Sequence, residues 1–347
     1  MIGFFKILKG GFCSFISVPF CFAYYLQGGI SIMVNIENIL VAADLSPHSS
    51  SVINRGFVLA KTQPKSRLTI FHATGTIFHA TGIDALNVLR DFLGEKQDSV
   101  KNKILQDAHD QLAALVAAVP ANQDGITVEL KVDQGFASAA VPRAVENSAI
   151  DLVVLGAHGS GFIQRVLLGS TASRLLRKST CPVLVVKREA YRSYQRVLIA
   201  VDFSPCSEKV LRFAHAIAPH ADFVLCHVCD VPFHEKMEYA GVSEDLILHY
   251  QVEARKRAMQ QLRELAHTAG LAVSDYSIAI LYGDASRTIL DHEEKYGFDL
   301  VVMGKHGSHM TEELLLGSVT KRVLASSQAD MLVVVDHRYP ELLVEKD

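Results

Sequence analysis

The sequence contains no tryptophan, no basic run interleaved with aromatic residues and no G-x-x-x-x-G-K-S/T order. The missing basic run and a formal net charge of −3 leave no general attraction to nucleic acid or to an anionic membrane, so no nucleic-acid partner is expected. The missing glycine–lysine order excludes a P-loop nucleotide site. The six cysteines follow no repeated spacing, which argues against a secreted disulfide scaffold.

Charged residues are also absent from residues 11–34. Read alone, this apolar stretch has the composition of a signal peptide or a membrane anchor, although Pro19 interrupts it. Met33 offers an alternative start, because the first expected strand follows it closely, and a structural appendage is a third interpretation. We therefore set residues 1–34 aside as an N-terminal extension, and we expect the remaining chain in the cytoplasm.

The most informative pattern is a short apolar run followed by spaced glycines, and it occurs twice. The first copy comprises residues 152–155, Gly156, Gly159 and Gly169-Ser170-Thr171, and the second comprises residues 300–303, Gly304, Gly307 and Gly317-Ser318-Val319. An apolar run bounded by glycine is typical of a strand buried on both faces. One copy would be equally consistent with tight turns, but two copies at equal spacing indicate a functional loop.

These loops have the chemistry of a phosphate site. Glycine permits a positive φ and a close approach of the backbone to a ligand. Ser170 and Ser318 are expected at the N-cap of the following helix. The free N–H groups and the dipole at that helix end favour an anion.

The chain as a whole is a tandem repeat. The opening N-I-L-V-A-A-D-L-S-P of residues 38–47 matches R-V-L-I-A-V-D-F-S-P of residues 196–205. Apolar strands alternate with amphipathic segments in both halves, which predicts an α/β fold with parallel, doubly wound sheets. The expected domains are 35–188 and 196–338, with a short polar linker at 189–195 and a C-terminal tail at 339–347. The expected strands lie near 39–43, 68–73, 126–132, 151–155, 182–186, 196–201, 223–228, 277–281, 300–303 and 331–335, and a long helical region is expected at 83–119.

A direct repeat interrupts the first half. The heptapeptide TIFHATG occupies residues 69–75 and again residues 76–82. Only one copy fits the second strand, and the first copy keeps nearly the helix-to-strand spacing of the other half. We therefore expect the second copy to be displaced into a loop or an edge extension, with a risk of register competition.

The repeated motifs resemble those of the universal stress protein family in its tandem two-domain form, across residues 36–337. The resemblance implies two Rossmann-like domains of the adenine nucleotide alpha hydrolase type, each a five-stranded parallel sheet flanked by helices. It also implies an adenine nucleotide (ATP, ADP or AMP, with or without Mg²⁺) between the ends of strands one and four, at the edge where parallel sheets bind ligands. The halves would pair along their fifth strands, and further association into a homodimer stays open.

The resemblance assigns matching roles in the two halves. The aspartates would face the ribose, the residues ending strand two would contact adenine, and the glycine loops with the following helix starts would hold the phosphates. The first site comprises Ala43, Asp44, Ala73, Gly156, Gly159, Gly169, Ser170 and Thr171. The second site comprises Val201, Asp202, Val228, Met303, Gly304, Gly307, Gly317, Ser318 and Val319. The duplicated heptapeptide would crowd the first site, so the second is the better candidate.

Other chemistry is less well supported. His158 and His306 occupy matching loop positions, where a histidine capping backbone groups is preferred to a catalytic one. Cys226 and Cys229 form a C-x-x-C pair that could bind zinc with His234 or His249. Zinc is disfavoured because Cys226 belongs to a buried strand, where the two cysteines point to opposite faces. We assign no catalytic residue and no metal ligand.

Three function hypotheses follow. The first is a nucleotide-binding stress regulator that changes conformation or protein partner with nucleotide. The second is a scaffold of the same fold that acts only through protein contacts. The third is a slow ATPase, because fast hydrolysis would need a lysine and Mg²⁺ carboxylates that the loops do not provide. The sequence does not identify protein partners.

Overall fold

The structure is a computed structural model. It describes residues 34–63, 65–75, 97–119, 126–157, 169–189, 192–229, 239–307 and 316–335. The second copy of the duplicated heptapeptide, His158, Gly159, His234 and the segment 83–96 of the expected long helix lie outside these ranges.

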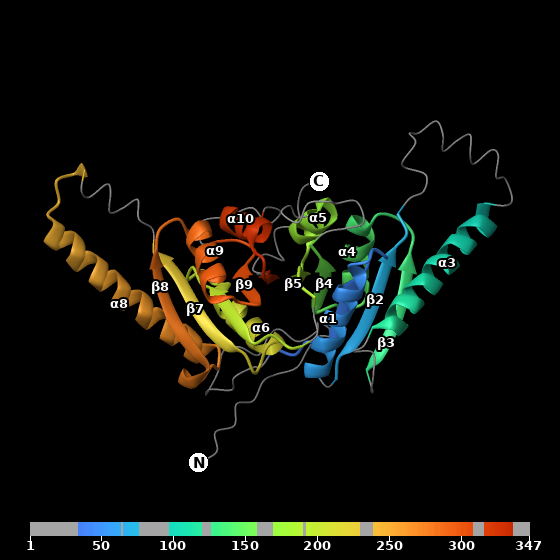
Figure 1. Cartoon of the computed structure of the whole chain (residues 1–347), viewed down its shortest axis with the longest axis horizontal. Helices are drawn as coiled ribbons and strands as arrows, with labels where there is room; N and C mark the ends of the chain where they lie inside the picture. Colours follow the sequence, from blue (N-terminus) through green and yellow to red (C-terminus); the bar gives the residue numbers. More distant parts are fainter. Residues whose placement is uncertain are drawn as a thin grey trace, which may run out of the picture. The chain divides into compact units, whose positions relative to one another are not determined.

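Each half alternates strands and helices (Figure 1). The first half contains β1 (Asn38–Ala42), α1 (Ser49–Thr62), β2 (Arg67–Ala73), α3 (Gln97–Ala118), β3 (Thr127–Asp133), α4 (Ala137–Asn147), β4 (Leu152–Gly156), α5 (Ser170–Lys178) and β5 (Val183–Val186). The second half contains β6 (Arg196–Ala200), α6 (Ser207–Ile217), β7 (Asp222–Cys229), α8 (Glu244–Thr268), the 3-10 turn Val273–Asp275, β8 (Tyr276–Tyr282), α9 (Ala285–Tyr296), β9 (Leu300–Gly304), α10 (Ser318–Ser326) and β10 (Asp330–Val334). The expected strands are therefore confirmed, with bounds that differ by one or two residues.

The strands of both halves join in one sheet with the order β3-β2-β1-β4-β5-β10-β9-β6-β7-β8. Among the named strands of the described ranges, pairing is parallel within each half and antiparallel between β5 and β10, where Leu184 lies opposite Leu332. The predicted α/β fold and the pairing along the fifth strands are confirmed. Because β1 and β4 are neighbours with helices on opposite faces, each half has the strand-order reversal where such sheets bind ligands.

Two apolar layers cover the sheet. Alternate residues of β1 face different layers, with Ile39 and Val41 packed under α1 and α3 and Leu40 under α4 and α5. The second half repeats this arrangement with α6 and α8 on one face and α9 and α10 on the other. The strands read as continuous apolar runs because both of their faces are buried.

The first copy of the duplicated heptapeptide lies in β2, as predicted, and pairs with both β1 and β3. The polar linker differs from its expectation at one residue. Tyr194 is almost fully buried, and its hydroxyl donates to Asp330 Oδ2 at 2.7 Å. The linker therefore contributes to the core between the halves.

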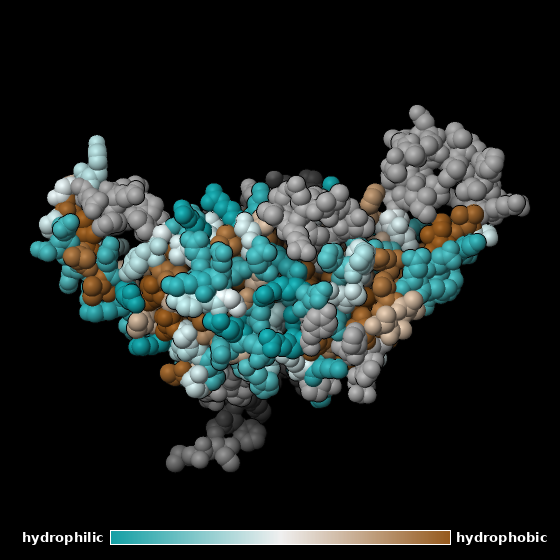
Figure 2. All heavy atoms as spheres, viewed as in Figure 1, coloured by the Kyte–Doolittle hydropathy of each residue, from teal (hydrophilic) through white to brown (hydrophobic). Residues whose placement is uncertain are grey.

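Figure 2 shows a mainly hydrophilic face with apolar side chains gathered over α8. Leu246, Leu248 and Tyr250 of this helix are each at least half exposed. Among the described residues, no helix is long and apolar enough to cross a membrane.

Candidate functional site

A cavity of about 520 Å³ opens at the carboxyl ends of β6, β7 and β9, beside the start of α10. All nine residues predicted for the second site line it, from three strand ends, the glycine loop and one helix start. Its other lining residues include Ser204, His227, Asp284, His306 and Arg322. Its volume falls within the range of about 300–1,000 Å³ that is usual for small-molecule sites.

The aspartate after β6 is held in a fixed orientation. Asp202 Oδ1 accepts hydrogen bonds from Ser204 N at 2.9 Å and from Ser207 Oγ at 3.2 Å. The intervening Phe203 has a left-handed backbone with φ of 58°, a conformation that costs about 1–3 kcal/mol for such a residue. The fold therefore accepts local strain to orient this carboxylate.

The first half builds the same turn. Asp44 Oδ1 accepts from Ser46 N at 3.1 Å and from Ser49 Oγ at 2.8 Å, and Leu45 has φ of 60°. Backbone strain at two equivalent positions in independent halves points to a shared role for the two aspartates.

The second carboxylate oxygen of Asp202 faces the glycine loop. A Cβ atom built on Gly307 would lie 3.3 Å from Asp202 Oδ2. Any side chain at this position would occupy the space next to that oxygen. Glycine here therefore keeps the carboxylate accessible to a ligand.

The described glycines of the two loops do not use the positive φ that glycine permits. None of Gly156, Gly304, Gly307 and Gly317 is among the positive-φ residues of the chain. Space is the constraint instead, since a Cβ on Gly317 would lie 3.2 Å from the carbonyl oxygen of Lys305. The loop and the helix start pack backbone against backbone.

The predicted N-caps are also wrong by one residue. Gly317 and Gly169 are the N-caps of α10 and α5, and Ser318 and Ser170 are the first helical residues. The Gly317 N–H donates to Lys305 O at 2.9 Å, which joins the helix start to the loop. The following N–H groups have no acceptor within the helix, so the end of α10 at the cavity carries a partial positive charge.

In the first half, the structure brings together part of the predicted site. Ala43 and Asp44 follow β1, whose Ala42 pairs with Leu155 of β4. Gly169 N donates to Ala157 O at 2.9 Å, which places the start of α5 beside the residue after Gly156. Ser170 and Thr171 are exposed at that start, and Ala73 ends the neighbouring β2.

Comparison with known proteins identifies the family. The model of the universal stress protein family matches residues 35–187 and again residues 193–335. The chain belongs to the universal stress protein family. A family member from Mycolicibacterium smegmatis is 28% identical over 253 residues, which are 65% of this chain and 75% of that protein. One from Mycobacterium tuberculosis is 29% identical over 211 residues, covering 56% of this chain and 66% of that protein.

A solved structure has the same tandem fold. The crystal structure of a universal stress protein from Archaeoglobus fulgidus matches with a TM-score of 0.56 at 20% sequence identity. The match covers 87% of this chain and 97% of that chain. At this identity the likeness supports the fold alone.

Within this universal stress protein, two histidines that the sequence analysis treated only as strand residues support the aspartate turns. His227 Nδ1 lies 2.8 Å from Val201 O, and His72 Nδ1 lies 2.8 Å from Ala43 O. A carbonyl oxygen only accepts, so each Nδ1 carries the proton. Both bonds fix the residue before an aspartate, and Phe203 packs on the His227 ring with centroids 4.4 Å apart. The matching histidines in the two second strands were the available sequence signal.

A charged pair at the cavity rim was also missed. Asp284 Oδ2 lies 3.6 Å from Arg322 Nη1. The hydroxyl of Ser286 and then the N–H of Arg287 donate to Asp284 and lower the pKa of its carboxyl group. Asp284 is therefore ionised and holds a cationic side chain at the mouth of the cavity.

The C-x-x-C pair does not form a metal-binding geometry in this structure. Cys226 and Cys229 pack into opposite layers of the sheet. Burial raises the pKa of the Cys226 thiol to about 12, which disfavours the thiolate that zinc requires. Within the described ranges, no three His, Cys, Asp or Glu side chains group closely enough to hold a metal ion.

Proposed function

We propose that this universal stress protein binds ATP or a related adenine nucleotide in the cavity of the second half and acts as a stress-response regulator. The observation that carries the proposal is the convergence of all nine predicted residues on one cavity of about 520 Å³. They come from four separate chain segments, so their meeting is a property of the fold. The nucleotide would change the conformation or the protein partner of the chain.

Each part of the cavity suits one part of the ligand. Val228 and Met303 offer apolar contacts for the adenine ring. Asp202 Oδ2 provides an acceptor for ribose hydroxyls. The start of α10 provides N–H groups for phosphate oxygens, with Arg322 at the rim as a further cation. The first half repeats the aspartate turn and the helix start, which supports a second site of the same kind.

Regulation is favoured over rapid hydrolysis. The lysine in the glycine loop, Lys305, has a buried side chain that ends on the first half, so it does not reach the cavity. Charge stabilisation by lysine and Mg²⁺ is what fast phosphoryl transfer depends on. Release of ADP in the presence of Mg²⁺ would measure any slow turnover.

The first test uses the purified full-length chain. It is denatured, any released nucleotide is identified by mass spectrometry, and ATP is titrated into the native protein by calorimetry. We expect copurified nucleotide or saturable ATP binding. A chain that neither carries nor binds an adenine nucleotide would refute the proposal and leave the scaffold function.

A substitution in the loop then locates the site. Gly307→Val places a branched side chain next to Asp202 Oδ2, and Gly307 is exposed, so the core is not disturbed. We expect ATP binding at the second site to weaken by at least about tenfold, or 1.4 kcal/mol. Gly156→Val, at the end of β4, tests the glycine loop of the first half. If only Gly307→Val has an effect, the nucleotide is held by the second half alone.

The ribose contact has its own test. Asp202→Asn is expected to weaken ATP binding by about 10- to 100-fold, because a hydrogen bond to a charged group is worth about 1.5–3 kcal/mol. The same substitution should matter less for 2′-deoxy-ATP. Asp222→Asn is the matched control, because Asp222 starts β7 at the opposite edge of the sheet. Equal losses for both nucleotides would place the aspartate away from the ribose.

A further inference from the structure

Lys305 lies within the glycine loop of the second half, between Gly304 and Gly307. The residue is only 3% exposed. Lys305 Nζ donates to the carbonyl oxygens of Arg177 at 2.8 Å and Ser179 at 3.3 Å. Both carbonyls belong to the C-terminal end of α5, so a loop of the second half is anchored on a helix of the first half.

The backbone of the same residue fixes the loop within its own half. Lys305 N donates to Val334 O at 2.7 Å, and Lys305 O accepts from Gly317 N at 2.9 Å. One residue therefore joins the glycine loop, β10, the start of α10 and the other half of the protein. Gly317 and the neighbouring Gly304 both line the cavity.

The first half provides an internal comparison. Ala157 occupies the position equivalent to Lys305 and makes the same two backbone bonds, from its N to Val186 O at 3.0 Å and to its O from Gly169 N at 2.9 Å. Alanine has no side chain that could reach the other half. The backbone arrangement thus forms without a lysine, and the cross-half anchor is an addition specific to the second loop.

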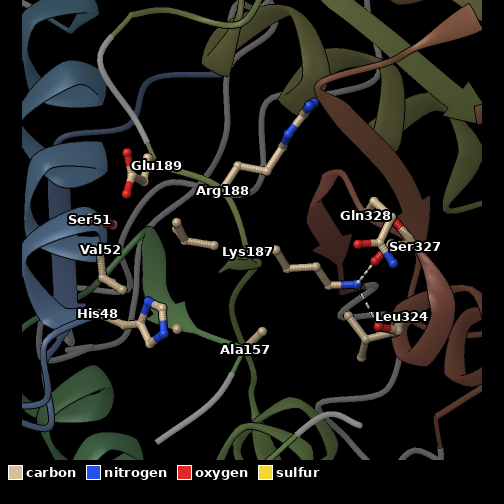
Figure 3. Close-up of a pocket in the computed structure, with 12 residues that line it drawn as sticks. His48, Ser51, Val52, Ala157, Lys187, Arg188, Glu189, Leu324, Ser327 and Gln328 are labelled. Carbon is tan, nitrogen blue, oxygen red and sulfur yellow. Dashed lines mark hydrogen bonds between the residues drawn. The ribbon is translucent and has the colours of Figure 1, made fainter. Parts of the chain in front are cut away.

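A second lysine makes a related contact in the opposite direction. Lys187 Nζ donates to Leu324 O and Ser327 O, both at 2.7 Å, at the C-terminal end of α10 (Figure 3). Lys187 follows β5 and lines a separate cavity of about 390 Å³ between the halves. Each of the two helices with a candidate phosphate site therefore has a lysine of the other half at its C-terminus, where a cation is favourable. Only Lys305 is also part of a glycine loop.

We propose that Lys305 is a positioning residue of the second nucleotide site, and that the first half completes this site by holding the loop through Lys305. The inference rests on the proposed nucleotide function. The phosphates require backbone N–H groups held in a fixed arrangement, and an anchored loop meets this requirement without an ordering step on binding. The adenosine moiety contacts strand ends that do not depend on the anchor.

This separation provides the test. Lys305→Ala copies the natural residue of the first half, so the variant is expected to fold, and Lys305→Met keeps the side-chain volume without the charge. Binding of ATP and of adenosine is titrated on the full-length chain. Hydrogen exchange of peptides from residues 300–327 measures nucleotide protection of the glycine loop and α10 in the second half alone. We expect both variants to bind ATP about tenfold more weakly, or 1.4 kcal/mol, and adenosine within about twofold of wild type.

Lys209→Met is the matched control. Lys209 Nζ also donates to a backbone carbonyl, that of Val335 at 2.8 Å, but Lys209 lies on α6 outside the loop. It should leave both affinities unchanged. Wild-type ATP affinity in Lys305→Ala, or equal losses for ATP and adenosine, would overturn the positioning role. Absence of ATP binding by the wild-type chain would instead refute the proposed function, so the two failures are distinguishable.

Discussion

Substitution of Asp330 is the most stringent test of the contact between the two halves. Asp330 is the first residue of β10, and its side chain is fully buried, with 0% exposure. Arg55 of the first half approaches its Oδ2 with Nη2 at 3.2 Å, and the Tyr194 hydroxyl donates to the same oxygen. The backbone N–H groups of Lys187 and Arg188 donate to Oδ1 at 2.8 and 3.0 Å.

Asp330→Ala should lower the free energy of unfolding by about 3–5 kcal/mol, because removing one partner of a buried ion pair leaves the other charge uncompensated. The side chain of Arg55 is 5% exposed and could not regain water without opening the interface. The assay is urea unfolding followed by circular dichroism, with the free energy extrapolated to water.

Asp299→Ala is the matched control. Its carboxylate also accepts two backbone N–H bonds, from Gln195 at 2.8 Å and Arg196 at 3.1 Å, and within the described part of the chain no salt bridge joins it to a cation. It should therefore lose less stability. The double variant Arg55→Met/Asp330→Leu should lose less free energy of unfolding than the single variants Arg55→Met and Asp330→Leu lose together, since no buried charge remains. A loss below about 1.5 kcal/mol in Asp330→Ala, or additive losses in the double variant, would refute the reasoning.

Three further predictions concern backbone strain and pH. Ala149 is exposed with φ of 45°, so Ala149→Gly should raise the free energy of unfolding by about 1 kcal/mol in the same urea assay. The control is Ala117→Gly on the exposed face of α3, which should lower it by about 1 kcal/mol. Burial lowers the pKa of Lys187 to about 8 from 10.5, so between these values the unfolded chain holds a proton that the folded chain lacks. The free energy of unfolding of the wild type, relative to that of Lys187→Met, should therefore rise with pH across that window. A difference that does not change with pH would contradict a buried Lys187 side chain. Burial raises the pKa of Cys226 from 9.0 to about 12. The contribution of its thiol to the free energy of unfolding is therefore complete below pH 9 and is lost as pH rises toward 12. Cys226→Ala should flatten that alkaline decline, measured from unfolding curves at each pH.

The elements of the fold were predictable because their signals are local. The apolar runs that became β4 and β9 are buried on both faces, and such runs are recognisable without knowledge of their neighbours. The repeat then paired Asp44 with Asp202, and parallel topology required their strand ends to meet the glycine loops at one edge. These two facts placed the second candidate site at that edge, and the family resemblance assigned its residues.

The errors were local as well. Ser170 and Ser318 were expected at N-caps from their residue type, but the N-cap of each helix is the preceding glycine, whose N–H donates to a carbonyl oxygen of the glycine loop. The preference of serine for the N-cap position was outweighed by a packing requirement, which cannot be read from residue type.

The sequence by itself determined the tandem repeat and the parallel sheets, because periodicity, glycine spacing and strand order are carried by short segments. The resemblance of its motifs to the family supplied the residues that line the second cavity. Only the tertiary structure decided how the halves depend on each other. Lys305 and Ala157 occupy equivalent positions, yet one anchors its loop on the other half and the other does not. Asp330 and Tyr194 likewise gain their role from Arg55, a distant residue in the chain. A buried charge is stable only beside its partner, and that partner is chosen by how the two halves pack.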